Sequence, residues 1–222
     1  MKKLILTAFA LTTAVGVFAQ GTVTFLNSIG GVGTTHVYGP SATTPSLKIM
    51  GGSTADTPAG TNTYAGLAFI GANGISNQYG AAYTFAQLLW ANGADVAESS
   101  LQPGGQTTTF KTGGSVGRIA QITDVITGLT PDGAAATFET VAWDDSTGLY
   151  PTWTQAGPAF LSGKIAGGMS GAFTVTGIGG SVNTPPNVMA PTFNLYFVPE
   201  PSTFALAGLG LAALVAYRRR NS

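Results

Sequence analysis

The chain of 222 residues contains no cysteine, and this absence excludes several kinds of chemistry. Disulfide bonds, thiolate nucleophiles, cysteine-ligated zinc sites and a lipid-modified N-terminal cysteine are all ruled out. The folded part must therefore be stabilised by packing, or by a metal ion or partner that the sequence does not reveal. We predict no cofactor, because no cofactor-binding motif lies in its required structural context.

Charge is also scarce, since only 8% of the residues are charged. Five of the nine basic residues lie at the two ends of the chain, as Lys2, Lys3, Arg218, Arg219 and Arg220. The body between the ends therefore has four basic and eight acidic residues. A body with a net charge of about −4 repels phosphate backbones, whereas nucleic-acid-binding proteins need a clustered basic surface. We exclude nucleic acid as a partner.

Convincing helical periodicity is absent from the body, residues 20–197, which we expect to form one domain. Alternation of apolar and polar residues predicts strands at 22–25, 173–176 and 193–197, and less regular strands are expected at 64–70, 83–90, 117–126 and 136–143. Turn-forming residues separate these runs. We predict a mainly β fold, an antiparallel β-sandwich of jelly-roll or immunoglobulin-like type, with helices only in the apolar segments at the two ends.

Residues 1–19 have the three-part pattern of a secretory signal peptide. Two lysines precede an apolar run, and small residues stand at Val17 and Ala19. We expect a signal helix here, with cleavage after Ala19, so that the mature protein begins at Gln20. This predicts that the protein is exported.

The opposite end has an uncharged run at 204–217, followed at once by Arg218, Arg219 and Arg220. Fourteen helical residues rise about 21 Å, which is short of the roughly 30 Å hydrocarbon core of a bilayer. Arginine side chains can extend the span, and positive charge stays on the cytoplasmic side. We predict a single transmembrane helix at 203–217 that anchors the protein in the inner membrane with its body outside the cytoplasm.

Directly before this helix stands the segment Val198-Pro199-Glu200-Pro201-Ser202. The order of Pro-Glu-Pro, short apolar helix and arginine cluster at 198–222 resembles the PEP-CTERM sorting signal of Gram-negative bacteria. The resemblance implies that exosortase, an integral-membrane protease, is a partner and recognises Pro199, Glu200 and Pro201. It also implies that the body reaches the cell surface or the extracellular space after cleavage.

The body itself is loosely similar to one recurrent type of PEP-CTERM protein from Verrucomicrobia and related phyla. The similarity rests on the residues at 21–27, 85–90, 98–101, 141–144 and 171–175, whereas 43–80 fits less well. Bodies of this type have no settled biochemical role, so the resemblance implies no activity.

A serine-hydrolase motif, G-x-S-x-G, occurs at 113–117 around Ser115. In a hydrolase this turn precedes a helix and the histidine follows the serine, whereas the residues after 117 predict a strand and the sole histidine is His36. We interpret the motif as a hairpin turn, and His36 as an ordinary strand or edge residue.

Adjacent Asp144 and Asp145 offer oxygen ligands for calcium, but they lack the regular spacing of known calcium loops, and turn chemistry explains them equally well. Neighbouring residues of a strand point to opposite faces, so the two form a poor glycosidase pair. No metal site is predicted.

Aromatic residues are the remaining candidates for ligand contact. Trp90 and Trp143 lie in apolar runs and are expected in the core. Tyr150 and Trp153 stand in a proline-flanked segment after Asp145, where we expect them to be exposed and able to contact a sugar. An exopolysaccharide is the candidate partner at this position.

Three functions therefore remain open. The first is an exported surface or extracellular-matrix protein with a structural or interaction role and no catalysis, which the low charge favours. The second is a carbohydrate-binding or adhesive module, which requires Tyr150 and Trp153 on one open face. The third is a secreted hydrolase, which requires two carboxylates in one cleft with different pKa values.

Overall fold

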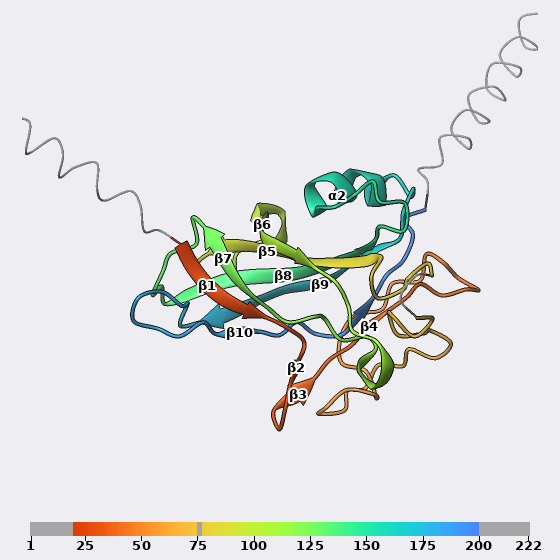
Figure 1. The fold of residues 1–222 in the computed structure, drawn as a ribbon, viewed down its shortest axis with the longest axis horizontal. Coiled ribbons are helices and arrows are strands. Elements are labelled where there is room, and N and C mark those ends of the chain that lie inside the picture. Colours follow the sequence, from red (N-terminus) through yellow and green to blue (C-terminus); the bar gives the residue numbers. More distant parts are fainter. Residues whose placement is uncertain (1–19, 75–76, 200–222) are drawn as a thin grey trace, which may run out of the picture.

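The computed structural model of the protein describes residues 20–74 and 77–199. Two predicted segments lie outside these residues: the signal segment with Ala19, and the transmembrane segment 203–217. Glu200, Pro201 and the three arginines of the C-terminus also lie outside them. Within them, strands predominate, as predicted (Figure 1). No helix in the described ranges has the length and apolar character needed to cross a bilayer.

The larger sheet has four antiparallel strands in the order β6-β5-β8-β9. Its members are β5 (Thr84–Asn92), β6 (Gln102–Thr108), β8 (Ala135–Asp144) and β9 (Gly167–Thr176). The register pairs Trp90 with Phe138, and Trp143 with Gly167. The runs predicted at 83–90, 136–143 and 173–176 are therefore confirmed as strands.

The second sheet has three strands in the order β10-β1-β7. These are β1 (Gln20–Phe25), β7 (Ile122–Thr127) and β10 (Asn187–Val188). Strand β1 is antiparallel to β7 but parallel to β10, so the prediction of a wholly antiparallel arrangement is wrong in this detail. Two short pairs complete the strands: β2 (Ser28–Ile29) with β3 (Gly33–Thr34), and β4 (Val37–Tyr38) with β11 (Phe193–Asn194), the second pair being parallel.

The two sheets share one hydrophobic core, the arrangement expected of a β-sandwich. Val23 and Phe25 of β1 and Ile126 of β7 meet Leu88 of β5 and Phe138 of β8, and all five are buried. This follows from the alternation of side chains along each strand, which directs every second residue to the same face. The jelly-roll and immunoglobulin-like alternatives stay predictions.

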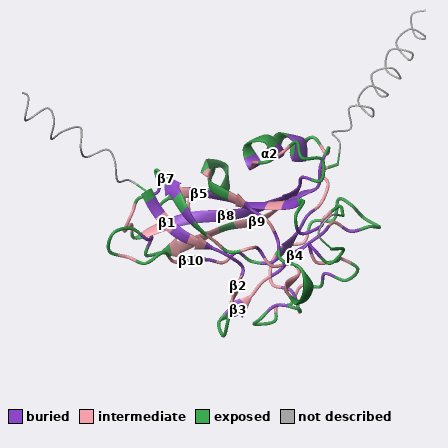
Figure 2. Ribbon diagram, viewed as in Figure 1, coloured by how far each residue is buried: buried purple, intermediate pink, exposed green. Residues whose placement is uncertain are grey.

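Strand β8 is buried on both faces, which Figure 2 shows as a continuous buried band through the sheet. Phe138 and Ala142 face the other sheet, whereas Val141 and Trp143 face outward. A nine-residue helix, α2 (Trp153–Leu161), covers this outer apolar face. The expectation of no helix in the body is therefore wrong, because the outward-facing apolar residues of β8 need a covering layer.

In the turn-rich region, residues 39–80, strand pairing among the described residues is limited to isolated bridges. The strand expected at 64–70 is absent. Of the run expected at 193–197 only β11 is a strand, and of the run expected at 117–126 only the part within β7 is a strand. The turn at 113–117 contains a short 3₁₀ helix, η3 (Gly113–Ser115), and it is closed by an antiparallel bridge between Phe110 and Ile119, so the hairpin interpretation is confirmed. A second 3₁₀ helix, η2 (Glu98–Ser100), precedes β6.

Candidate functional site

The segment by which the chain leaves the body is firmly held up to the start of the Pro-Glu-Pro motif. Tyr196 exchanges two backbone hydrogen bonds with Gly167 at the start of β9, at 2.7 and 3.1 Å. The backbone N–H of Phe197 donates to the carbonyl oxygen of Pro45 at 2.8 Å. The backbone of the body is therefore held by hydrogen bonds as far as Phe197. Val198 and then Pro199, the first residue of the Pro-Glu-Pro motif, come next in the chain.

Side chains strengthen this exit. The ring of Tyr196 meets that of Phe160 in α2 edge to face, with ring centres 5.2 Å apart, and Val198 packs against the same cluster. On the other side, the Nζ atom of Lys48 lies 5.7 Å from the centre of the Tyr196 ring. In Figure 1 the described chain ends next to α2, at the end of the molecule opposite to β1. We call Tyr196, Phe197 and Val198 the exit segment.

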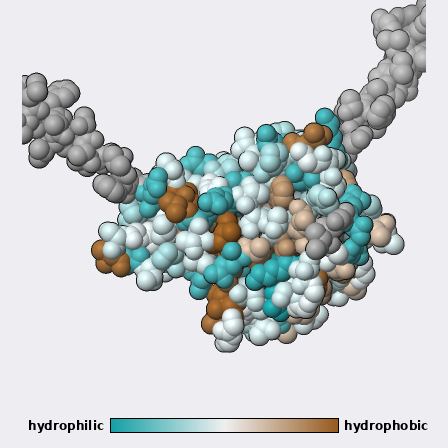
Figure 3. All heavy atoms as spheres, viewed as in Figure 1, coloured by the Kyte–Doolittle hydropathy of each residue, from teal (hydrophilic) through white to brown (hydrophobic). Residues whose placement is uncertain are grey.

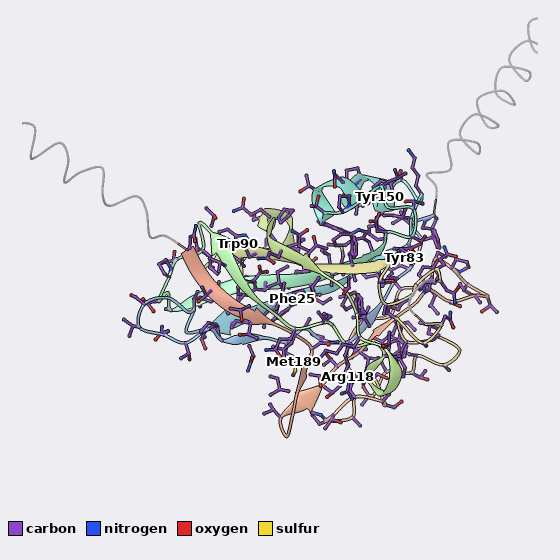
Figure 4. The ribbon with its side chains drawn as sticks, viewed as in Figure 1. Phe25, Tyr83, Trp90, Arg118, Tyr150 and Met189 are labelled. Carbon is purple, nitrogen blue, oxygen red and sulfur yellow. The ribbon has the colours of Figure 1, made fainter. Side chains whose placement is uncertain are left out.

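The two aromatic residues predicted to bind a ligand do not share an open face. Trp153 is only 9% exposed and stands between Trp143, at 5.7 Å between ring centres, and Phe160, at 5.9 Å. Its backbone N–H donates to Oε1 of Gln87 on β5 at 2.9 Å. Figure 4 shows Tyr150 beside α2, where it packs against the same cluster.

The expectation that Trp153 is exposed is thus wrong, because it serves to cover the outer face of the sheet. The sequence did contain a signal for this helix that we did not interpret. Thr152 and Gln155 have the spacing of a capping box, and Trp153, Ala156 and Phe160 recur at helical intervals on the buried side.

Asp144 and Asp145 are both buried and occupied by local hydrogen bonds. Asp144 accepts from the backbone N–H and the hydroxyl of Ser146, both at 3.1 Å, and Asp145 accepts from the backbone N–H of Tyr150 at 2.6 Å. This is the turn chemistry considered from the sequence. In the described part of the chain, no three His, Cys, Asp or Glu side chains gather in a way that could hold a metal ion.

A different pair of acids, Glu139 and Glu98, accepts hydrogen bonds from two adjacent backbone N–H groups of β9. Glu139 of β8 accepts from the backbone N–H of Gly171, and Glu98 accepts from the backbone N–H of Ala172 at 3.2 Å. Glu139 is 1% exposed, and its Oε2 atom has no hydrogen-bond partner. Burial, and secondly the charge of Glu98, raise the pKa of Glu139 to about 7. Glu98 borders a hollow of about 290 Å³ that Ala172 and Phe173 also line, whereas Glu139 itself is buried.

The histidine that a serine hydrolase would need is engaged elsewhere. His36 is buried, and its Nδ1 atom lies 2.8 Å from Oδ1 of Asp56. The second oxygen of Asp56 accepts from the hydroxyl of Thr192 and the backbone N–H of Ser53. Among the described residues Ser115 has no hydrogen bond to His36. His36 is thus part of a buried structural network, which the interpretation as a strand or edge residue did not foresee.

An apolar cavity of about 380 Å³ opens beside the exit segment. Phe197 lines it together with Pro45, Phe69 and Tyr79. Burial, and secondly the charge of Asp144, raise the pKa of Tyr79 to about 12, so that its hydroxyl stays neutral. No charged side chain lines the cavity, and its walls suit an apolar group better than a charged one.

Comparison with known proteins identifies the segment that follows the body. A family profile described as the PEP-CTERM protein-sorting motif matches residues 197–220. Neither the curated proteins nor the solved structures include a match to this chain. The chain thus carries a PEP-CTERM sorting motif, as its sequence predicted, and the motif indicates export and membrane-associated sorting by exosortase.

Proposed function

We propose that this protein is an exported cell-surface or extracellular-matrix protein with a structural or interaction role and no catalysis, delivered through exosortase. The observation that carries the proposal is the sorting motif at 197–220, which begins within the exit segment of a packed β body. In this position the motif is joined to the body without a linker. The signal segment 1–19 supplies the route across the inner membrane, and residues 203–217 retain the protein there until cleavage.

A role without catalysis is supported by the hydrogen bonds that occupy Asp144, Asp145 and the His36–Asp56 pair within the body. The rival role as a carbohydrate-binding module loses its original support, because Trp153 is buried. An adhesive role remains compatible with the proposal, since adhesion needs a stable exposed surface and no reacting group.

The test is the processing of the Glu200→Ala variant of the full chain in a host that contains exosortase. The apolar run is unchanged, so the variant should still enter the membrane, but the loss of the recognised carboxylate should leave it uncleaved. Intact mass of the protein from envelope and medium measures the result. Ser202→Ala, two residues away, is the matched control and should be processed as the wild type. Processing of Glu200→Ala at the wild-type rate would contradict the proposal.

A further inference from the structure

The position of the exit segment determines which face of the body lies nearest the membrane. The described chain ends at Pro199, and the predicted transmembrane helix begins at residue 203, four residues further on. Four extended residues reach at most about 14 Å. If residues 203–217 are in the bilayer, as the proposed function holds, the surface around the exit segment is held at the headgroup layer.

Exposed apolar and basic residues flank the exit segment on its two sides. On the α2 side, Leu161 directly follows Phe160, which contacts Tyr196, and Lys164 lies three residues further on. Leu161 is 66% exposed, and Lys164 is also exposed. Figure 3 shows apolar and hydrophilic residues side by side over α2, next to the point where the chain leaves the described body.

The other side repeats this combination. Leu47 accepts a hydrogen bond through its carbonyl oxygen from the side chain of Asn194, two residues before Tyr196, at 2.9 Å. The next residue, Lys48, lies over the Tyr196 ring. Both side chains are exposed. We call Leu47, Lys48, Leu161 and Lys164 the exit face.

The charge of this face differs from that of the body as a whole. It holds two of the four basic residues of an acidic body, and neither lysine forms an ion pair within the described residues. Glu139 of β8 interacts electrostatically with Lys48 but is buried, and Glu98 of η2, which interacts with Glu139, is held by the backbone N–H of Ala172. Lysine can lay its apolar stem along a membrane surface while its ammonium group meets phosphate.

We propose that the exit face is a docking surface for anionic phospholipid headgroups, which holds the body against the membrane while the Pro-Glu-Pro motif lies at the membrane surface. Two leucines enter the interfacial layer, and two lysines contact lipid phosphates. A lysine near an anionic surface changes the equilibrium between docked and undocked body about fivefold. Docking restricts the motif to the depth at which a membrane-embedded protease works. The rest of the body, with its excess negative charge, would not be attracted to an anionic membrane surface.

The absence of cysteine allows a direct test, because a single introduced thiol labels one position. Leu161→Cys is labelled with an environment-sensitive fluorophore in the full chain and reconstituted in vesicles of phosphatidylethanolamine and phosphatidylglycerol. The matched control is Val182→Cys, another exposed apolar residue, 83% exposed. Val182 lies near the start of β8, because its neighbour Ser181 is hydrogen-bonded to Asp132 just before that strand. The exit segment lies at the other end of β8. A strand of ten residues places the two positions roughly 30 Å apart.

A headgroup-spin-labelled lipid should quench the label at 161 several-fold more than the label at 182. Lys164→Glu should reduce the quenching at 161 by about fivefold or more, whereas Lys111→Glu, an equal charge change on an exposed residue of the 110–119 hairpin, should leave it unchanged. Equal quenching at 161 and 182 would overturn the docking surface. Carbonate extraction of the same vesicles separates the two hypotheses: a chain that is extracted lacks the membrane anchor of the proposed function, whereas a chain that resists extraction but shows equal quenching refutes docking alone.

Discussion

The sandwich and the turn-rich region at residues 39–80 are stabilised in different ways. In the sandwich, continuous strand ladders satisfy the backbone, and large apolar side chains such as Phe25 and Phe138 fill the space between the sheets. The turn-rich region has isolated bridges in place of ladders, and a buried set of polar side chains joins it to the rest of the protein.

Asp56 is the centre of this polar set. Its two carboxylate oxygens accept from the backbone N–H of Ser53 and the hydroxyl of Thr192, and pair with His36. Thr192 precedes β11 and His36 precedes β4, so one carboxylate links three distant parts of the chain. Backbone groups that cannot join a ladder still need partners when buried, and side-chain oxygens supply them here.

The two regions also treat buried acids differently. Asp56, in the turn-rich region, has several hydrogen-bond partners, whereas Glu139, in the middle of the large sheet, has an oxygen with none. Burial disfavours the charged carboxylate and raises the pKa of Glu139, and the backbone N–H of Gly171 offsets this only in part.

The largest effect is expected in the sandwich. Phe138→Ala removes a fully buried ring from between the sheets and should lower the free energy of unfolding by about 4 kcal/mol, through lost burial and the cavity that remains. Chemical denaturation measures this change. Val125→Ala on β7 is the control, because Val125 is 49% exposed and its truncation should have little effect. A loss at position 138 no larger than at position 125 would show that the shared core is not the main stabilising element.

The next effect is expected in the turn-rich region. Asp56→Ala leaves a buried N–H, a buried hydroxyl and His36 without their partner, and should cost about 3 kcal/mol. Asp56→Asn keeps one accepting oxygen and should cost less. Amide hydrogen exchange should rise at residues 39–80 and around Thr192 while β5 and β8 stay protected. If protection falls equally in the sheet, the two regions unfold as one unit and the comparison between them fails.

The smallest effect concerns Glu139 and depends on pH. Its pKa of about 7 in the folded protein lies above its ordinary value of 4.5, so the unfolded chain ionises first as pH rises. The free energy of unfolding should therefore fall between about pH 4.5 and 7, by at most about 3 kcal/mol from this group, and then stay constant. Denaturation of wild type and Glu139→Gln across this range measures the effect, and the decline should be absent from the variant. An identical decline in both proteins would assign it to other groups.

Much of the fold was predictable from local pattern. The alternation at 22–25 and 173–176 and the apolar runs at 83–90 and 136–143 correspond to β1, β9, β5 and β8, because side-chain period alone indicates a strand with a buried face. The helix α2 was not predicted, because Gly157 and Pro158 obscure its pattern and because the need to cover β8 arises only in the assembled sheet.

The candidate site was predicted unevenly for the same reason. The sorting motif is a linear signal, so its match at residues 197–220 could be predicted from the order of residues in the chain, and recognition of Pro199, Glu200 and Pro201 stays a prediction. Tyr150 and Trp153 were wrongly expected to be exposed, because they pack against the outward-facing apolar residues of β8, and this contact forms only in the folded protein. Glu139 gave no local warning of its unusual burial.

Sequence by itself determined the sorting motif, the absence of thiol chemistry and most of the strand-forming segments, because each depends on neighbouring residues alone. Tertiary structure decided the rest. It joined His36, Asp56 and Thr192 across more than 130 positions of the chain, buried Trp153, and placed Lys48 and Lys164 on either side of the exit segment. Such groupings depend on how distant segments pack, and packing responds to the shape of the whole body and not to the order of adjacent residues.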